Sequence, residues 1–497
     1  MSFPPFAATS AAFTPCADAR NFIGGAFVSP QVDAGTLPVH NPRHGAVMAQ
    51  VHLSGAADVD AAVKAAEAAL PAWRALPVRD RAQVFYRLRE RMAAEIESLT
   101  WLVSHENGKV YAEARAEVEK AIECVEFGCS LANLAAGGQI DVSKGVNCAE
   151  TYEPLGVVAG VTPFNFPLMV PLWMLPQALV GGNAFVLKPS ERVPLSTQRL
   201  AVLLREAGLP DGIFNIVNGT QPVVEALCDH PRIRALGFVG STRVAKLVYG
   251  RASAAGKRAL CLGGAKNHLI VVPDADVDLS AENIVASFAG CAGQRCMAAS
   301  VLVAVGDCER VLDAIVEKAG RLRTGVDMGP VISAAAHARI TGAITRAAEE
   351  GAVVRLDGRG ASADAGGYWV GPTILDRVRP DMPAGCEEIF GPVLSIVRVA
   401  TVDEAIAIEN ANPYGNASSV FTTSGAVARY VMGRVEAGMC GVNVGVPVPR
   451  EPFGFAGWND SAFGHGNLTG WDGFRFWTRA RKVTSKWALQ SDWTWMS

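Results

Sequence analysis

The chain has 497 residues, of which 50% are hydrophobic and 19% are charged, and its formal net charge at pH 7 is −3. A chain of this length is too long for one hydrophobic core, so two or more domains are expected. The near balance of 45 basic and 48 acidic residues gives nucleic acid or an anionic membrane no electrostatic attraction, so neither is expected as a partner.

Localisation signals are weak in this sequence. No apolar stretch reaches the roughly 18–20 residues that span a bilayer. The start lacks the basic segment of a secretory signal, since its first basic residue is Arg20. Eleven cysteines without a paired framework favour reduced thiols and a cytoplasmic location. The spacings Cys124/Cys129 and Cys291/Cys296 differ from the CxxC spacing of zinc sites, so no metal is expected.

The first part of the chain has the pattern of helices, with helical apolar spacing over 57–70, 79–106 and 113–128. From Glu150 onward, short apolar runs alternate with helical stretches. These runs predict strands at 157–161, 185–188, 213–217, 235–239 and 258–262, with helices over 167–180 and 194–207 between them. Such alternation is typical of an α/β fold with a doubly wound parallel sheet.

A second alternating series begins at 268–272 and runs to about Val444, so two α/β domains are expected to meet near residue 265. The first domain is expected to comprise 1–138 and 157–265, and the second domain 266–455. A C-terminal return segment follows at 456–481. Two strand-like segments, 139–156 and 482–497, are expected to extend outside the cores.

Four motifs carry the chemistry. The run Gly293-Gln294-Arg295-Cys296 places a thiol on a glycine-marked break after an apolar helical stretch. A neighbouring guanidinium favours the thiolate, which is the nucleophilic form of cysteine. The other three motifs are TPFNFP at 162–167, VLKPSE at 186–191 and EEIFGPV at 387–393.

In this order and spacing, the motifs resemble the aldehyde dehydrogenase superfamily over nearly the whole chain, from about Asn21 to Trp487. The resemblance implies a Rossmann-like NAD-binding domain formed by 1–138 and 157–265, followed by an α/β catalytic domain. It also implies that 139–156 and 482–497 form a β arm that pairs between subunits, so a homodimer or homotetramer is expected. A small-molecule aldehyde is the expected substrate.

The family mechanism assigns roles to two residues. Cys296 would attack the carbonyl carbon of an aldehyde and form a thiohemiacetal oxyanion. Asn165 would donate its side-chain amide to that oxygen, with the backbone N–H of Cys296 as the second donor. Hydride transfer to the nicotinamide would leave a thioester on Cys296. Without the family context, Asn165 would be read as a turn residue that bonds its own backbone.

The cofactor residues are also implied by the resemblance. Lys188 and Glu191 follow a strand at its carboxyl end, the usual ligand side of an open α/β sheet. They would bond ribose hydroxyls, and the carboxylate would repel a 2′-phosphate, which favours NAD over NADP. Glu388 and Phe390 match the family positions at the nicotinamide ribose and ring.

Further cofactor contacts are expected in two turns. Thr162 and Phe164 belong to the TPFNFP motif. Gly240 and Ser241 stand between a strand and a helix, where backbone N–H groups could face a phosphate. Many family members carry a glycine where this chain has Ala245, so pyrophosphate contacts are expected to differ in detail.

The release step separates branches of the family. Hydrolytic members use a glutamate in a L-E-L-G-G-K stretch to activate water, whereas residues 260–266 here read LCLGGAK. Either Cys261 or Leu262 takes the glutamate position, so coenzyme A is expected as the acyl acceptor. The absence of this glutamate, together with AKNH at 265–268 and GQRCM at 293–297, resembles the CoA-acylating methylmalonate-semialdehyde dehydrogenase branch.

A carboxylated semialdehyde requires cations in the substrate site. Arg295 can contact a carboxylate in a bidentate manner, and Lys120 stands where the branch usually has an arginine. Two alternatives stay open. One is a dehydrogenase of another acidic semialdehyde with hydrolytic or CoA release. The other is a catalytically inactive binding or structural protein with this fold. The intact Cys296, Asn165 and Lys188 argue against the latter.

Overall fold

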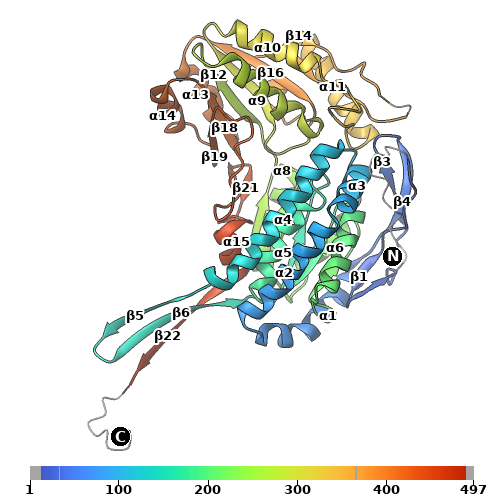
Figure 1. Cartoon of the computed structure of the whole chain (residues 1–497), viewed down its shortest axis with the longest axis vertical. Helices are drawn as coiled ribbons and strands as arrows, with labels where there is room; N and C mark the ends of the chain where they lie inside the picture. Colours follow the sequence, from blue (N-terminus) through green and yellow to red (C-terminus); the bar gives the residue numbers. More distant parts are fainter. Residues whose placement is uncertain (1–12, 33, 364–365, 488–497) are drawn as a thin grey trace, which may run out of the picture.

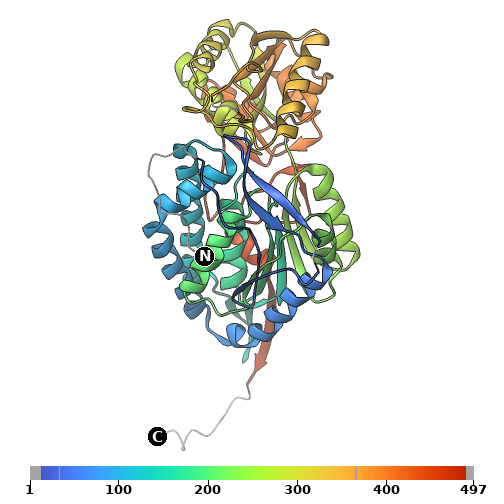
Figure 2. The ribbon, with the colours of Figure 1, turned by 90° about the vertical axis from the view of Figure 1, so that its right-hand side faces the viewer.

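Two β-sheets, each covered by helices on both faces, organise the chain into a larger and a smaller body, and a three-stranded arm projects from the larger one (Figures 1 and 2). The computed structural model describes residues 13–32, 34–363 and 366–487. Within these ranges, the helices are all too short or too polar to cross a membrane.

The sheet of the larger body has eight strands, and its centre is parallel. In spatial order the strands are β2 (Ala26–Val28), β1 (Asn21–Ile23), β9 (Phe214–Ile216), β8 (Ala184–Lys188), β7 (Val157–Val161), β10 (Ile233–Val239), β11 (Arg258–Leu262) and β21 (Ala462–Phe463). Strands β9 to β11 run parallel, and every residue of β7 and β8 is buried. Burial on both faces explains why β7 and the first four residues of β8 are continuous apolar runs.

Nine helices of the described chain belong to the larger body. They are α1 (Ala56–Ala75), α2 (Val78–Ala94), α3 (Ile96–Asn107), α4 (Tyr111–Leu134), α5 (Met169–Val180), α6 (Leu195–Glu206), α7 (Gln221–Asp229), α8 (Thr242–Ala254) and α15 (Gly470–Trp477). Helices α1, α7 and α8 cover one face of the sheet, and α5 and α6 cover the other, with α2 and α4 outside them. A hairpin of β3 (Thr36–Asn41) and β4 (Ala46–His52) packs beside α3.

The prediction of one helix over 79–106 is wrong, because the chain breaks between α2 and α3. Glu95 leaves the helical conformation, with φ −104° and ψ 16°. Both helices pack on α4 and α6, but α2 also contacts α5, whereas α3 also contacts β3. Both helices are amphipathic, so apolar spacing alone cannot detect a break of one residue.

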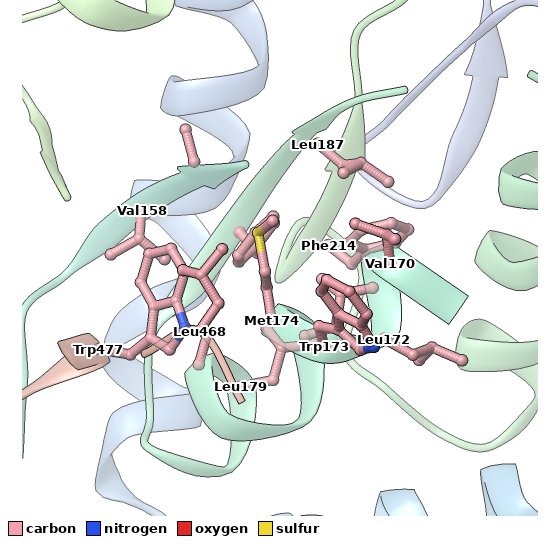
Figure 3. Close-up of a cluster of buried hydrophobic side chains, with 14 of the residues drawn as sticks. Val158, Val170, Leu172, Trp173, Met174, Leu179, Leu187, Phe214, Leu468 and Trp477 are labelled. Carbon is pink, nitrogen blue, oxygen red and sulfur yellow. The ribbon is translucent and has the colours of Figure 1, made fainter. Parts of the chain in front are cut away.

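The core of the larger body gathers around α5, all of whose residues are buried (Figure 3). The side chain of Met174 meets Leu468 and Trp477, from the end of the chain, over Gly237 of β10. The Trp477 ring meets the Phe185 ring edge-on, with centroids 5.6 Å apart. The C-terminal return segment therefore completes the core of the larger body.

The smaller body holds a seven-stranded sheet. In spatial order its strands are β14 (Val353–Leu356), β15 (Thr373–Asp376), β16 (Val393–Val399), β13 (Ala299–Val305), β12 (Asn267–Val271), β18 (Ala417–Phe421) and β19 (Met439–Val442). Its helices are α9 (Val277–Ala289), α10 (Glu309–Gly320), α11 (Ala334–Glu349), α12 (Pro383–Cys386), α13 (Val402–Asn410) and α14 (Gly425–Met432). The chain crosses between the sheets over residues 263–266, beside the predicted junction at 265.

The arm consists of β5 (Gly138–Ser143), β6 (Val146–Pro154) and β22 (Thr478–Lys486), all antiparallel (Figure 1). Strand β22 begins four residues before the predicted position of 482, because Thr478 already pairs with Pro154. Residues 488–497 of the predicted arm lie outside the described residues. Every residue of β5 is exposed, including Ile140 at 66%. The arm therefore presents apolar side chains and a sheet edge to its surroundings.

Candidate active site

The order of strands in the larger sheet creates a switch point between β7 and β10. From β7 the chain proceeds to β8 and β9 in one direction, and from β10 to β11 in the other. Ligands of open α/β sheets bind beyond the carboxyl ends of strands at such a point. Thr162, Lys188 and Gly240 stand there, and the Thr162 N–H donates to the Lys188 carbonyl at 3.1 Å.

Lys188 and Glu191, which are predicted to bind ribose, form an ion pair. Lys188 is buried, and its Nζ lies 2.9 Å from Oε2 of the half-buried Glu191. Burial raises the pKa of the Glu191 carboxyl, but the Lys188 ammonium outweighs burial and leaves that pKa below its usual value. Glu191 is therefore a charged acceptor at the edge of the switch point.

The turn before α8 can accommodate an anion. Ser241 occupies the N-cap position without a side-chain cap, so N–H groups of the first turn of this 13-residue helix remain for a ligand. A Cβ at Gly240 would lie 2.6 Å from the Phe238 ring, so a side chain there would displace that ring. Ala245, which replaces the frequent glycine, is fully buried behind the turn.

Glu388 and Phe390 bring the smaller body against loops that follow strands of the larger sheet. The Ala265 N–H donates to Oε1 of Glu388 at 3.0 Å, and burial raises the pKa of that carboxyl. Phe390 has a left-handed backbone with φ 53°, and its ring meets the Phe164 ring edge-on at 5.9 Å. Both phenylalanines are half-buried. The two predicted nicotinamide residues thus lie opposite the TPFNFP loop.

The nucleophile loop follows a strained turn. After α9, Cys291, Ala292 and Gly293 all have positive φ angles, of 50°, 51° and 68°. Left-handed backbone costs a residue with a side chain about 1–2 kcal/mol, so the turn needs support from its surroundings. Oε1 of Glu113 supplies part of it by accepting the Cys291 N–H at 2.6 Å. Strain of this kind is typical of functional sites.

Two asparagines fix Cys296 itself. The carbonyl of Cys296 accepts from Nδ2 of Asn267 and from Nδ2 of Asn416, each at 2.8 Å. Asn267 also donates to the Ala298 carbonyl at 2.8 Å. Neither role was predicted from the sequence. Because a buried side-chain amide requires hydrogen-bond partners, Asn267 inside the AKNH motif was the residue that could have indicated such a role.

Asn165 is held against the same loop. Its Nδ2 donates to the Gln294 carbonyl at 2.9 Å, and Nζ of Lys109 donates to the Asn165 carbonyl at 2.6 Å. Lys109 forms a fully buried ion pair with Glu117 at 2.5 Å, and the other oxygen of Glu117 accepts two N–H groups at the start of α5. The buried pair fixes the loop that carries Asn165. Sequence reasoning missed this pair, because neither residue belongs to the four motifs.

Arg295 lowers the pKa of the Cys296 thiol, as expected, but burial has the larger effect. Burial raises the pKa of the Cys296 thiol to about 12, and the negative charge of Glu388 adds to the rise. The backbone N–H groups of Cys296 and Met297 and the Arg295 guanidinium lower the pKa, but by less. The neutral thiol is therefore favoured at neutral pH, and its proton must leave before or during attack.

A cavity of about 600 Å³ brings Cys296, Arg295 and Lys120 together. Aromatic and apolar side chains form most of its wall: Phe166, Met169, Trp173, Val446, Val448 and Phe455. Both cations already have acidic neighbours, since Arg295 lies 3.6 Å from Glu113, and Lys120 lies 3.1 Å from Glu451. The cavity can hold a small aldehyde beside the thiol, with cations within reach.

The glutamate position of hydrolytic relatives lies on β11. Cys261 and Leu262 are both buried in the sheet, paired with Phe238 and Val239 of β10. Burial raises the pKa of the Cys261 thiol far above its usual value. Neither side chain can take a proton from water at neutral pH.

Comparisons with known proteins agree with this geometry. The aldehyde dehydrogenase family model matches residues 27–483. Malonate-semialdehyde dehydrogenase 2 of Geobacillus kaustophilus (strain HTA426) is 45% identical over 477 residues, which cover 94% of this chain and 98% of the relative. The solved structure of methylmalonate-semialdehyde dehydrogenase from Oceanimonas doudoroffii is 41% identical, with a TM-score of 0.93 and coverage of 96% and 99%. A Sinorhizobium meliloti 1021 protein described as a methylmalonate-semialdehyde dehydrogenase, and solved with NAD, is 40% identical with the same TM-score and coverage. The chain therefore belongs to the aldehyde dehydrogenase family.

Proposed function

We propose that this chain oxidises malonate or methylmalonate semialdehyde with NAD and transfers the acyl group to coenzyme A, which gives acetyl-CoA or propionyl-CoA, CO2 and NADH. The observation that carries the proposal is the cavity in which Cys296 is joined by Arg295 and Lys120. The names of the relatives support the same substrate class.

The first chemical step belongs to Cys296. Its sulfur gives its proton to solvent and bonds the aldehyde carbon, so the carbonyl oxygen becomes an oxyanion. Nδ2 of Asn165 bonds the Gln294 carbonyl through one hydrogen, which leaves its second hydrogen for the oxyanion, and the Cys296 backbone N–H is the other donor. When bound, NAD supplies the acceptor for the aldehyde hydride. The carbon then remains on Cys296 as a thioester.

The later steps release carbon dioxide and the acyl group. The substrate's β-carboxylate leaves as CO2, and its electron pair takes a proton at the α-carbon. The thiol of coenzyme A then bonds the thioester carbon, and the Cys296 sulfur departs with a proton. Cys261 and Leu262 offer water no base, so a thiol is the better acceptor.

The residues of the switch point fit a dinucleotide. The first turn of α8 can donate to the pyrophosphate, and Gly240 keeps that approach free of a side chain. The ion pair of Lys188 with Glu191 offers a donor and a charged acceptor to ribose hydroxyls.

Glu191 is expected to select NAD over NADP. The negative charge of its carboxylate repels a 2′-phosphate, so kcat/KM for NAD should exceed that for NADP by about 10-fold or more, which corresponds to about 1.4 kcal/mol. Glu191→Gln should reduce this ratio. Steady-state kinetics with both cofactors provide the measurement, and equal kcat/KM values in the unaltered chain would exclude the role.

Asn165→Ala is expected to lower kcat by about 10²–10³-fold, because it removes one donor to the oxyanion. NAD affinity should be retained, since Asn165 faces the nucleophile loop and not the pair at Lys188. Steady-state NADH formation and a fluorescence titration with NAD measure the two quantities. A kcat within threefold of the unaltered chain would rule out Asn165 as an oxyanion donor.

One assay tests the whole proposal. NADH formation is measured with malonate and methylmalonate semialdehyde, with and without coenzyme A, and the acyl products are identified by mass spectrometry. Acetyl-CoA and propionyl-CoA support the proposal. Free acid as the product, with no effect of coenzyme A, assigns the chain to hydrolytic dehydrogenases of acidic semialdehydes.

We further propose that the chain assembles as a homodimer or homotetramer through its arm. The exposed strand β5 and the apolar side chains of Ile140 and Val142 support this, because exposed sheet edges pair readily. Light scattering of the full chain tests the assembly. All eleven cysteines are free, which supports a reducing compartment such as the cytoplasm.

A further inference from the structure

The substrate cavity contains more acidic than basic side chains, which is unexpected for a site that takes an anion. Its lining includes three cations, Lys120, Arg295 and Arg450, and four glutamates, at positions 113, 117, 123 and 451. Glu117 is neutralised by Lys109. The remaining cations and carboxylates are equal in number, so the cavity offers a carboxylated substrate little net attraction.

Lys120 is the cation most fully occupied by its neighbours. Its Nζ donates to Oε2 of Glu123 and to Oε2 of Glu451, each at 3.1 Å. An ammonium group has three donors, so one remains for a substrate.

Glu451 and Glu123 differ in their exposure to solvent and in their cationic partners. The side chain of Glu123 is 37% exposed and has a second cation, since Nε of Arg450 lies 3.8 Å away. The side chain of Glu451 is only 9% exposed, and its other oxygen accepts a weak hydrogen bond from the Cys124 thiol at 3.9 Å. Burial lowers the pKa of Lys120, and Glu451 is the largest opposing influence, which leaves that pKa above its usual value. Glu451 is thus the dominant partner of Lys120.

We propose that Glu451 is a specificity-determining residue, which occupies the Lys120 ammonium and places a buried negative charge beside the position of the substrate carboxylate. This inference rests on the proposed function. A carboxylated substrate must displace Glu451 from Lys120 or bind next to it, and like charges in a poorly solvated site repel strongly. Arg295 then makes the main contact with the substrate carboxylate. Plain aldehydes compete better with carboxylated ones in this site than in a site where the Lys120 ammonium is free.

The test compares a carboxylated with a plain aldehyde. Glu451→Gln keeps the shape of the side chain and removes its charge. The ratio of kcat/KM for malonate semialdehyde to kcat/KM for propanal should rise about 10-fold in this variant. Glu126→Gln is the control for loss of a carboxylate: Glu126 lies on α4 as Lys120 does, pairs with Arg89 on the surface and does not line the cavity, so the ratio should stay unchanged. An unchanged or lower ratio in Glu451→Gln overturns the proposal.

Two further variants identify the route of the effect. Glu451→Ser also removes the charge, with a smaller side chain, and serves as the test if Glu451→Gln folds poorly. The ratio of kcat/KM for malonate semialdehyde to that for propanal must rise in this variant too. In a Lys120→Met background, Glu451→Gln should raise the ratio by clearly less than 10-fold, because no ammonium is released. An equal rise in both backgrounds contradicts the occupation of Lys120. Failure of the proposed function would appear in the unaltered chain, as no acyl-CoA formed from malonate semialdehyde.

Discussion

Replacement of Cys296 by alanine is expected to abolish NADH formation with every aldehyde, a loss of roughly 10⁴-fold or more for a covalent nucleophile. The expectation rests on geometry: Cys296 lines the cavity, its carbonyl is fixed by Asn267 and Asn416, and Asn165 is tied to the same loop through Gln294. Stopped-flow absorbance at saturating NAD would measure both the first turnover and later turnovers.

Binding of NAD should survive the same substitution, because Lys188 and Glu191 stand on the larger body at the switch point. A fluorescence titration with NAD checks this, and Cys440→Ala provides a control at an exposed thiol of β19. Cys291 also lines the cavity and is the competing nucleophile. Retained turnover in Cys296→Ala, together with its loss in Cys291→Ala, would move the role to Cys291.

Much of the fold followed from patterns that depend on burial. Strand β7 and the first four residues of β8 are apolar because both faces of the parallel sheet are covered, so the positions of these strands were predictable. The KPSE and TPFNFP motifs follow these strands, which explains why they meet at one edge of the sheet. The break at Glu95 was not predictable, because helices on either side of it keep an apolar face.

The electrostatics of the site could not be read from the sequence. Adjacent Arg295 and Cys296 suggested a stabilised thiolate, but burial and Glu388, which lies 92 positions later, outweigh the guanidinium. The same limit hid Glu451 beside Lys120, since the two residues are 331 positions apart. Local sequence gives the types of side chain in a site. The sign of their combined field depends on residues that only the fold brings together.

Without coenzyme A, the chain is expected to form one NADH per active site rapidly and then to turn over slowly. General-base assistance accelerates proton transfer by about 10²–10⁴-fold, and the position that supplies it in hydrolytic relatives holds buried Cys261 or Leu262. Attack of water on the Cys296 thioester should therefore be the slow step. Stopped-flow traces with malonate semialdehyde would show a burst, whose amplitude equals the concentration of active sites.

Coenzyme A should remove this slow phase, because its thiol replaces water as the nucleophile. Steady turnover should rise by about 10²-fold or more, and the burst should give way to a linear trace. Glu388 is the carboxylate that most affects Cys296, but it already accepts the Ala265 N–H, and its buried position favours the neutral form. A linear trace without coenzyme A, with free acid as product, would show that a group such as Glu388 activates water. In that case Glu388→Gln should restore the burst. This result would distinguish a site in which Glu388 acts as the general base for water from a site that has no such base.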